Sequence, residues 1–237
     1  MRLVSWNCQA GFDKKTHVVD RLNPDVLVLQ ECNEVNVLSQ RSDVSHLWRT
    51  PGNPGSKGFG IYAMNGWTVR PIASPSDDPW LIPCEIITPE GTEWTRLLGM
   101  WTNVQKGVDR PNYAGQFAQS LETWRHEIEK VPTLIAGDLN ASLQGPSKAP
   151  HQQNINTVES LGLRSAYHHF NNIEHGNEQD MTLKWVGPGK VTYYYHCDFV
   201  FIPPALQSNG TCNIDPIFTS SEKHISDHQP VVVDLLA

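Results

Sequence analysis

Residues 134–140, with the sequence Leu-Ile-Ala-Gly-Asp-Leu-Asn, are the stretch around which this chain is organised. The three apolar residues before Gly137 predict a short buried strand whose backbone turns out of its sheet at the glycine. Because residues two apart on an extended backbone point to the same side, Asp138 and Asn140 are expected to project together from the carboxyl end of this strand. Open α/β sheets bind ligands at that end. The alternative is an ordinary strand that ends in an Asx turn, with Asn140 as a helix cap, since Asp and Asn favour both.

Two strands near the N-terminus are predicted to end in the same way. The run Arg2–Asn7 ends in Asn7, and the apolar run 26–31 ends in Glu31. A short helix is expected between them at residues 18–22. This order of strand, helix and strand predicts a βαβ unit with two parallel strands.

The rest of the chain is predicted to contain further strands and two longer helices. Residues 112–130 form the clearest helix, because their apolar side chains recur at helical spacing on one face. A second helix is predicted at residues 152–161, just before Gly162. The expected strands are 59–64, 67–70, 81–88, 93–101, 133–138, 182–186, 193–202, 212–218 and 229–235. We expect residues 1–237 to form a single α/β domain, because no repeat, low-complexity tract or linker interrupts them.

The composition is that of a globular protein. Hydrophobic residues make up 39% and charged residues 18% of the 237 positions, and no apolar run approaches a transmembrane length. The N-terminus enters a strand-like run directly, without the features of a signal peptide. The five cysteines are scattered, form no CxxC pair and are expected to be reduced and buried. These features predict a cytoplasmic protein with no membrane association.

The formal net charge of −7 argues against a wide basic surface that grips nucleic acid. It does not exclude nucleic acid as a substrate. A site of carboxylates around a divalent metal ion also makes the sequence negative, and there the metal supplies the positive charge.

Polar residues at the ends of apolar runs are spread along the whole chain. They are Asn7, Glu31, Asp138, Asn140, Asp198, Asp227 and His228. Buried carboxylates repel one another and are costly to desolvate, so their collection at one place needs a compensating cation. Mg²⁺ meets this need because it takes oxygen ligands. A histidine backed by an Asp then suits phosphoryl chemistry, since it stabilises the charge on a pentavalent oxyanion.

Five short motifs appear in the order found in one known family. They are Ser5-Trp6-Asn7, Leu29-Gln30-Glu31, Gly137-Asp138-Leu139-Asn140, His196-Cys197-Asp198-Phe199-Val200-Phe201 and Ser226-Asp227-His228-Gln229-Pro230-Val231. The set resembles the motifs of the endonuclease/exonuclease/phosphatase superfamily, which includes deoxyribonuclease I and exonuclease III. The resemblance spans residues 5–231. It implies an α/β fold, a four-layer α-β-β-α sandwich with two mixed central sheets, and hydrolysis of phosphoesters with Mg²⁺ or Mn²⁺.

The resemblance also implies roles for individual residues at the metal. Glu31 matches the principal metal ligand of the family, and Asn7 matches its partner at the metal site. Asp227 matches a second carboxylate close to the metal.

Four further residues match positions that act on the phosphate or on the attacking water. Asp138 matches the residue that orients or deprotonates the water, and Asn140 matches a neighbour that contacts the phosphate. His228 matches the histidine that contacts the phosphate, and Asp198 matches the carboxylate that hydrogen-bonds this histidine.

Two other residues are matched less tightly. Tyr113 resembles the tyrosine that abasic-site endonucleases place over the phosphate, and the alternative is a packing residue at a helix N-terminus. Members similar to deoxyribonuclease I carry a histidine after the strand that corresponds to residues 93–101. This chain has Asn103 there instead, as in the branch similar to exonuclease III, which leaves the acid that protonates the leaving group open.

Other residues were weighed as ordinary structural groups. His196 is interpreted as a structural hydrogen-bonding residue. His168, His169 and His175 are expected to lie solvated in a polar loop. The segment 182–185 resembles one that lies near the substrate in nucleases of the family, and the alternative is an ordinary strand with an exposed tryptophan.

The leading hypothesis is therefore a monomeric, metal-dependent phosphodiesterase that acts on DNA as an endonuclease or an exonuclease. The alternative is a phosphatase or phosphodiesterase for a small molecule or a lipid headgroup. A third class is an inactive binding module that has kept the fold. The sequence separates the first two poorly, because the shared site recognises the phosphate and the surrounding loops recognise everything else.

Overall fold

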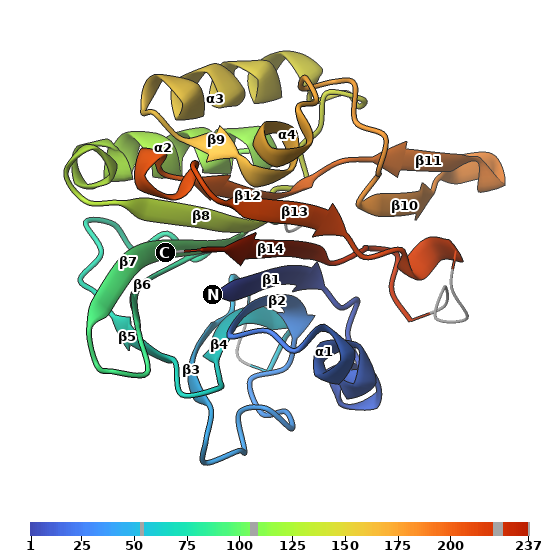
Figure 1. Cartoon of the computed structure of the whole chain (residues 1–237). Coiled ribbons are helices and arrows are strands. Elements are labelled where there is room, and N and C mark those ends of the chain that lie inside the picture. Colours follow the sequence, from blue (N-terminus) through green and yellow to red (C-terminus); the bar gives the residue numbers. More distant parts are fainter. Residues whose placement is uncertain (53–54, 105–108, 220–224, 237) are drawn as a thin grey trace.

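The computed structural model describes residues 1–52, 55–104, 109–219 and 225–236. Two six-stranded sheets pack against each other, and helices cover the outer face of each sheet (Figure 1). The N-terminus lies beside the C-terminal strand, where the terminal ammonium donates to the carbonyl oxygen of Leu235 at 2.8 Å. None of the helices in these ranges is both long and apolar enough to cross a membrane.

The first sheet contains the N-terminal and C-terminal strands, in the order β13-β14-β1-β2-β4-β3. Its strands are β1 (Arg2–Asn7), β2 (Val26–Cys32), β3 (Ser45–Arg49), β4 (Gly58–Ala63), β13 (Gly210–Ile214) and β14 (Val231–Leu235). Helix α1 (Thr16–Leu22) connects β1 to β2, which are parallel, and the other pairs are antiparallel. The predicted βαβ unit is therefore present.

The second sheet has the order β5-β6-β7-β8-β12-β9. Its strands are β5 (Thr68–Pro71), β6 (Leu81–Ile87), β7 (Glu93–Trp101), β8 (Thr133–Asp138), β9 (Arg164–Ser165) and β12 (Asp198–Ile202). Helix α2 (Tyr113–Lys130) connects the parallel strands β7 and β8, and the remaining pairs are antiparallel. Both sheets are thus mixed, as expected.

The remaining elements lie around this sandwich. They are the helices α3 (Lys148–Ser160) and α4 (Ala166–Asn171), the hairpin strands β10 (Leu183–Val186) and β11 (Thr192–Tyr195), and the 3₁₀ turns η1 (Phe12–Lys14), η2 (Pro188–Lys190), η3 (Pro204–Leu206) and η4 (Ile217–Thr219). The β10–β11 hairpin projects away from the sandwich (Figure 1).

Side chains alternate between the two faces of the central strands and pack into three hydrophobic cores. In β8, Leu134 and Ala136 pack between the two sheets, whereas Ile135 faces the core under α2 and α3. In β2, Val28 faces the space between the sheets, and Leu29 faces α1. A strand buried on both faces has no polar side to display, which explains why these strands are continuous apolar runs.

Several predicted boundaries differ from the structure. The predicted strand 193–202 is two strands, because the chain leaves the hairpin at His196 and enters the second sheet at Asp198. The second long helix begins at Lys148 rather than at residue 152, since a proline is tolerated in the first helical turn. Strands β3 and β9 and helix α4 were not predicted. β3 is a partly exposed edge strand, and the other two are too short to show a period.

Gly137 should be the least replaceable glycine of the fold. A Cβ atom built on it would lie 1.9 Å from the carbonyl oxygen of Met100 on the paired strand β7. We expect Gly137→Ala to lower the free energy of unfolding by about 3 kcal/mol or more, because a backbone oxygen cannot move aside. Gly91→Ala is the control. Its Cβ meets no atom within 4 Å, so only the positive φ of +84° should matter, at about 1–2 kcal/mol. Equal losses in urea unfolding of the two variants would contradict this account.

Candidate active site

Asp138 is the centre of the candidate site. It ends β8, is fully buried and stands directly opposite Asp198 of the antiparallel strand β12. Two carboxylates in this position repel each other. Burial, followed by the charge of Asp198, raises the pKa of Asp138 well above its usual value. The end of β8 therefore holds a carboxylate with an increased affinity for a proton.

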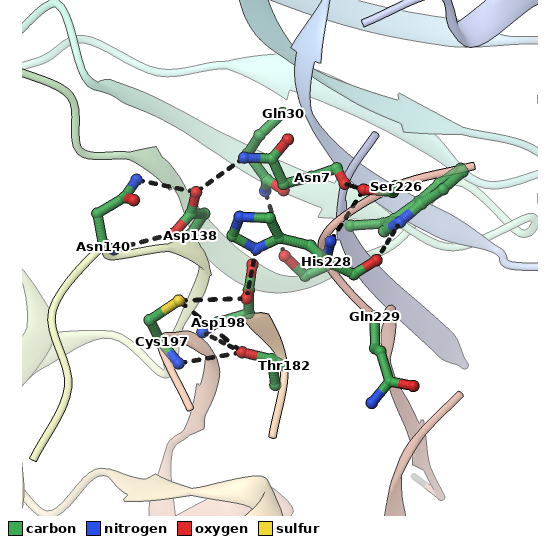
Figure 2. A network of polar contacts seen from close by, with 12 residues as sticks. Asn7, Gln30, Asp138, Asn140, Thr182, Cys197, Asp198, Ser226, His228 and Gln229 are labelled. Carbon is green, nitrogen blue, oxygen red and sulfur yellow. Dashed lines mark hydrogen bonds and ion pairs between the residues drawn. The ribbon is translucent and has the colours of Figure 1, made fainter. Parts of the chain in front are cut away.

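Three N–H groups fix the orientation of the Asp138 carboxylate (Figure 2). The backbone N–H of Asn140 donates to Oδ1 at 2.9 Å, and the Nδ2 groups of Asn140 and Asn7 each donate to Oδ2 at 2.9 Å. Asn140 adopts a positive φ of 46°, which turns its side chain back toward Asp138. The Asx turn of the alternative interpretation is thus present, but Asn140 caps no helix, because the next helix begins at Lys148.

Beside Asp138, a buried histidine and carboxylate form a pair. Nδ1 of His228 donates to Oδ2 of Asp198 at 2.9 Å, and both side chains are almost inaccessible to solvent. Burial alone would lower the pKa of His228, but the charges of Asp198 and Asp138 outweigh it and raise this pKa. An imidazolium is therefore stabilised between two carboxylates. Ligand atoms of Asp138, Cys197, Asp198 and His228 all lie within 4.8 Å of one another.

The backbone around His228 is held by strand β1 (Figure 2). Ser226 Oγ donates to the carbonyl of Asn7 at 2.7 Å and accepts from the backbone N–H of His228 at 3.0 Å. The indole of Trp6 donates to the carbonyl of His228 at 3.2 Å. Trp6 and Ser226 belong to the sequence motifs but had no predicted role, and their hydrogen bonds indicate that they position His228.

Thr182 supports the other half of the pair. Its Oγ1 accepts from the backbone N–H groups of Cys197 at 3.0 Å and Asp198 at 3.1 Å. Oδ1 of Asp198 is buried and has no hydrogen-bond partner in the described ranges. The sequence resemblance put Thr182 in a segment near the substrate, whereas in the structure its hydroxyl contacts the backbone that carries Asp198.

Glu31 leaves the sheet at a register shift. It lies at the shift between Gln30 and Cys32 and has a φ of 57°, so its partly exposed side chain points out of the ladder. Oε1 of Glu31 accepts from Asn7 Nδ2 at 3.2 Å, and Oε2 pairs with Nζ of Lys57 at 2.7 Å. Asn7 therefore links Glu31 to Asp138.

Asp227 lies in the same neighbourhood. Burial raises its pKa, and the nearby charges of Glu31 and Asp198 raise it further, although His228 acts in the opposite direction. The pKa of Lys15 is lowered, first by burial and also by the charge of Lys57. Two lysines thus accompany the predicted metal ligands. Sequence reasoning missed both, because each comes from a loop without a recognisable pattern.

Tyr113 borders a pocket next to this site, whereas Asn103 is hydrogen-bonded to a residue of α2. Tyr113 begins α2, is partly exposed and borders a pocket of about 330 Å³ together with Asn140 and Trp185. Asn103 is held through its backbone, which exchanges two hydrogen bonds with the side chain of Gln116 at 2.9 and 2.7 Å. Within the described residues, its side-chain oxygen is buried without a hydrogen-bond partner. Tyr113 is thus part of the pocket, whereas no hydrogen bond within the described ranges joins Asn103 to the other site residues.

The expectation of a solvated histidine loop is wrong for His168. This residue lies buried in α4, and its Nε2 is 3.0 Å from Oε1 of Glu178. His175 is half-buried and stacks on His168 with ring centroids 3.6 Å apart, whereas His169 is exposed as predicted. His196 is buried and hydrogen-bonded to a backbone carbonyl, in agreement with its structural interpretation. A short helix with tertiary contacts, invisible in the local sequence, explains the error.

No family model and no curated protein matches the sequence. Solved structures match it over the whole length. The endonuclease domain of TRAS1, a telomere-specific non-LTR retrotransposon, superposes with a TM-score of 0.71 at 16% identity and covers 100% of this chain and 98% of its own. The 3′ phosphatase NExo from Neisseria, bound to a product DNA hairpin, gives 0.71 at 18% identity with 100% of both chains covered. An AP endonuclease from Archaeoglobus fulgidus gives 0.68 at 16% identity, again with 100% of both chains covered.

This chain has the DNase I-like fold. The four-layer sandwich implied by the sequence motifs is confirmed, including the two mixed sheets and the helices on both outer faces. In this DNase I-like chain, residues from β1, β2, β8, β12 and the segment before β14 meet in one network of polar contacts (Figure 2).

Proposed function

We propose that this chain is a single-domain, divalent-metal-dependent phosphodiesterase that cleaves DNA. One observation carries the proposal: the oriented Asp138 carboxylate lies beside the buried His228–Asp198 pair and is joined through Asn7 to Glu31. Such an arrangement combines a base, a cationic hydrogen-bond donor and an oxygen-rich site for a cation. The similar structures support the choice of DNA, since they are an endonuclease domain, a 3′ phosphatase bound to product DNA and an AP endonuclease.

Glu31, Asn7 and Asp227 would hold the metal ion. Their donor atoms are carboxylate and carboxamide oxygens, which fit Mg²⁺ or Mn²⁺ and not a soft metal. The repulsion that raises the pKa of Asp227 would be relieved by a cation. When bound, such an ion polarises a phosphate oxygen and offsets its negative charge.

Asp138 would accept the proton of the attacking water. Its raised pKa suits a general base near neutral pH, and its three N–H donors hold one carboxylate orientation. Asn140 would also contact the phosphate. Its side chain donates to the carbonyl of Thr102 at 3.0 Å, which fixes it in place.

His228 would donate a hydrogen bond from Nε2 to a phosphate oxygen. Asp198 fixes the ring, because its carboxylate can only accept from Nδ1–H. A positive donor aimed at the phosphate stabilises the additional charge of the pentavalent transition state. We assign Tyr113, at the edge of the adjoining pocket, to substrate contact. The assignment of Asn103 to the leaving-group side rests on the family resemblance alone.

The β10–β11 hairpin gives this site a surface suited to bases. Trp185 and Tyr193 are exposed on the same face of the hairpin, and their ring centroids are 5.5 Å apart. Trp185 also borders the pocket beside Asn140. Exposed aromatic rings next to a phosphate site provide stacking platforms for single-stranded or splayed bases. This surface favours DNA over a small phosphoester.

Trp185→Ala should raise KM for DNA by roughly 5–150-fold and change kcat little, since one stacked base contributes about 1–3 kcal/mol. Tyr194→Ala is the matched control. Residues alternate along the hairpin, so Tyr194 stands on the face opposite to Trp185, and it does not border the pocket. Steady-state kinetics on a labelled oligonucleotide would measure both variants, and equal effects of the two would count against the stacking surface.

Glu31→Gln should abolish Mg²⁺-dependent activity and metal binding at the carboxylate site, while the fold stays intact. The substitution removes the main anionic ligand, but it breaks only a partly exposed ion pair with Lys57, worth about 0–1 kcal/mol. Calorimetric titration with Mn²⁺ and the melting temperature in chelator would check both statements. Glu34→Gln, an exposed neighbour, should behave as the wild type. A large loss of chelator-state stability in Glu31→Gln alone would make Glu31 a structural residue.

The proposed function is tested with a panel of substrates at fixed Mg²⁺ and in excess chelator. The panel comprises plasmid DNA, single-stranded DNA, a duplex with an abasic site, RNA, and small phosphomonoesters and phosphodiesters. Metal-dependent cleavage of DNA with kcat/KM well above that of the small esters is the expected result. Turnover of the small esters alone would favour the phosphatase alternative, and full activity in chelator would exclude the metal mechanism.

A further inference from the structure

Four histidines and one glutamate gather at a place separate from the candidate active site. They come from α3, α4, the segment between α4 and β10, and the connection between β11 and β12. The residues are His151, His168, His175, His196 and Glu178. All four imidazole rings surround Phe199, with ring centroids 5.0 to 6.4 Å from it. Chain segments as far apart as residues 151 and 196 therefore contribute to one histidine cluster.

Glu178 is the only carboxylate in this histidine cluster. It is buried, and its Oε1 is 3.0 Å from Nε2 of His168 and accepts from the backbone N–H of Gly176 at 2.9 Å. Its other oxygen accepts from the side chain of Gln144. Ligand atoms of His168, His175 and Glu178 all lie within 4.8 Å of one another. Two imidazole nitrogens and a carboxylate oxygen are thus already within reach of one small ion.

Four ring nitrogens of the histidine cluster lack partners in the described part of the chain. Both nitrogens of His151, Nε2 of His196 and Nδ1 of His175 are buried without a hydrogen bond. His151 is 0% and His196 1% exposed, so bulk water does not reach them. A buried polar group without a partner is costly, and such groups are few in native proteins. Their concentration around one carboxylate indicates an additional species at this place.

The tautomer of His196 indicates what this species is. Nδ1 of His196 lies 2.9 Å from the carbonyl oxygen of Asp180, which can only accept, so Nδ1 carries the proton. In the neutral ring, Nε2 then carries a lone pair that no described group satisfies. A backbone carbonyl that fixes one ring nitrogen is the usual support of a metal-ligating histidine. Burial lowers the pKa of His196 to about 4, so the ring is neutral at pH 7.

We propose that the histidine cluster is a second metal site, which takes a transition-metal ion of the Zn²⁺ class through His168, His175, Glu178 and Nε2 of His196. Imidazoles with a single carboxylate suit Zn²⁺ and its neighbours in the first transition row, whereas Mg²⁺ requires oxygen ligands. His151, packed against the same phenylalanine, is the alternative fourth ligand.

The proposed metal site has an entry path from solvent and a hydrogen bond that orients one of its ligands. A cavity of about 360 Å³ reaches His168 and His175 between α3 and α4, which provides an entry path from solvent. The ring of His168 is held on its other side, where Nδ1 is 2.7 Å from Oγ of Ser165. The ion would tie α4, the segment between α4 and β10, and the start of β12 together. Because His196 lies two residues before Asp198, this site would stabilise the start of the strand whose carboxylate positions His228.

Metal binding by the Glu31→Gln variant tests the proposal without relying on activity, since its carboxylate site is disabled. The protein is stripped with chelator and titrated with Zn²⁺ and with Co²⁺. We expect one tightly bound equivalent, visible absorption bands typical of four-coordinate Co²⁺, and a rise in melting temperature of roughly 5–10 °C at about 100-fold excess over Kd. No binding, or Co²⁺ with only the weak spectrum of an octahedral ion, would overturn the proposal.

Two variants locate the ion. His175→Ala removes a half-buried ring at the edge of the histidine cluster, and His196→Gln keeps a polar side chain at the buried position. Each should weaken Co²⁺ binding at least tenfold and remove most of the thermal shift. His126→Ala is the control, because that exposed histidine lies on α2 and does not line the cavity beside His168 and His175. Binding that survives in both variants would overturn the assignment. If a variant does not fold, the metal content of Glu31→Gln still decides whether a second site exists.

Discussion

Replacing Asp138 by Asn should lower kcat by roughly 10²–10⁴-fold, the range that a positioned general base contributes. Asparagine keeps the shape of the side chain but cannot accept a proton. Both oxygens of Asp138 accept hydrogen bonds from Asn7 or Asn140, so the new NH₂ group of asparagine would face at least one N–H donor and lose that hydrogen bond. KM should change much less than kcat, because the proton is transferred only in the reaction step.

The same substitution should cost little stability. Burial and the charge of Asp198 raise the pKa of Asp138, so its ionised form destabilises the metal-free fold at neutral pH, and removing the charge offsets the weakened hydrogen bonds. We expect the melting temperature in chelator to stay within about 5 °C of the wild type. Asp43→Asn, at an exposed position, should change neither quantity. A kcat within threefold of the wild type would remove Asp138 from the mechanism.

The second large effect concerns the buried pair. His228→Ala should lower kcat by roughly 10²–10³-fold or more, the scale of one lost oxyanion donor. Asp198→Asn should be comparable or milder, because it disturbs the orientation and charge of the ring without deleting it. The double variant should be hardly worse than His228→Ala, since residues that act as a unit are strongly non-additive.

The cycle is measured as kcat for the wild type, both single variants and the double variant on one substrate at fixed Mg²⁺. His169→Ala controls for loss of an imidazole elsewhere and should have no effect. Losses that multiply in the double variant would mean that His228 and Asp198 work independently, despite their 2.9 Å hydrogen bond.

The family motifs implied the sandwich, whereas the polar ends of apolar runs, a short-range pattern, predicted the place of the candidate site. A strand buried on both faces is an apolar run, and its end is marked by the first polar residue, as at Asn7 and Asp138. Parallel strands then bring such ends to one edge. The assignment of His228 to Asp198 came from the family motifs, because a contact across 30 residues leaves no local signal.

Other parts depend on tertiary contacts that no local pattern encodes. The hairpin and β12 were predicted as one strand, since both halves are rich in aromatic residues and the break at His196 carries no glycine or proline. The histidine cluster was missed for a related reason. Its members lie up to 45 residues apart, and His168 gains its burial only from the packing of α4. Lys57 reaches Glu31 from a loop whose course the sequence does not fix.

The most direct test of the central claim is cleavage of duplex DNA labelled at both ends by wild type, Asp138→Asn and His228→Ala, purified in parallel. Fragments are quantified over a Mg²⁺ titration and in excess chelator. The account predicts metal-dependent cleavage by the wild type and a rate at least about 100-fold lower for each variant at saturating Mg²⁺. Equal rates for all three proteins, or cleavage by the wild type that persists in chelator, would contradict it.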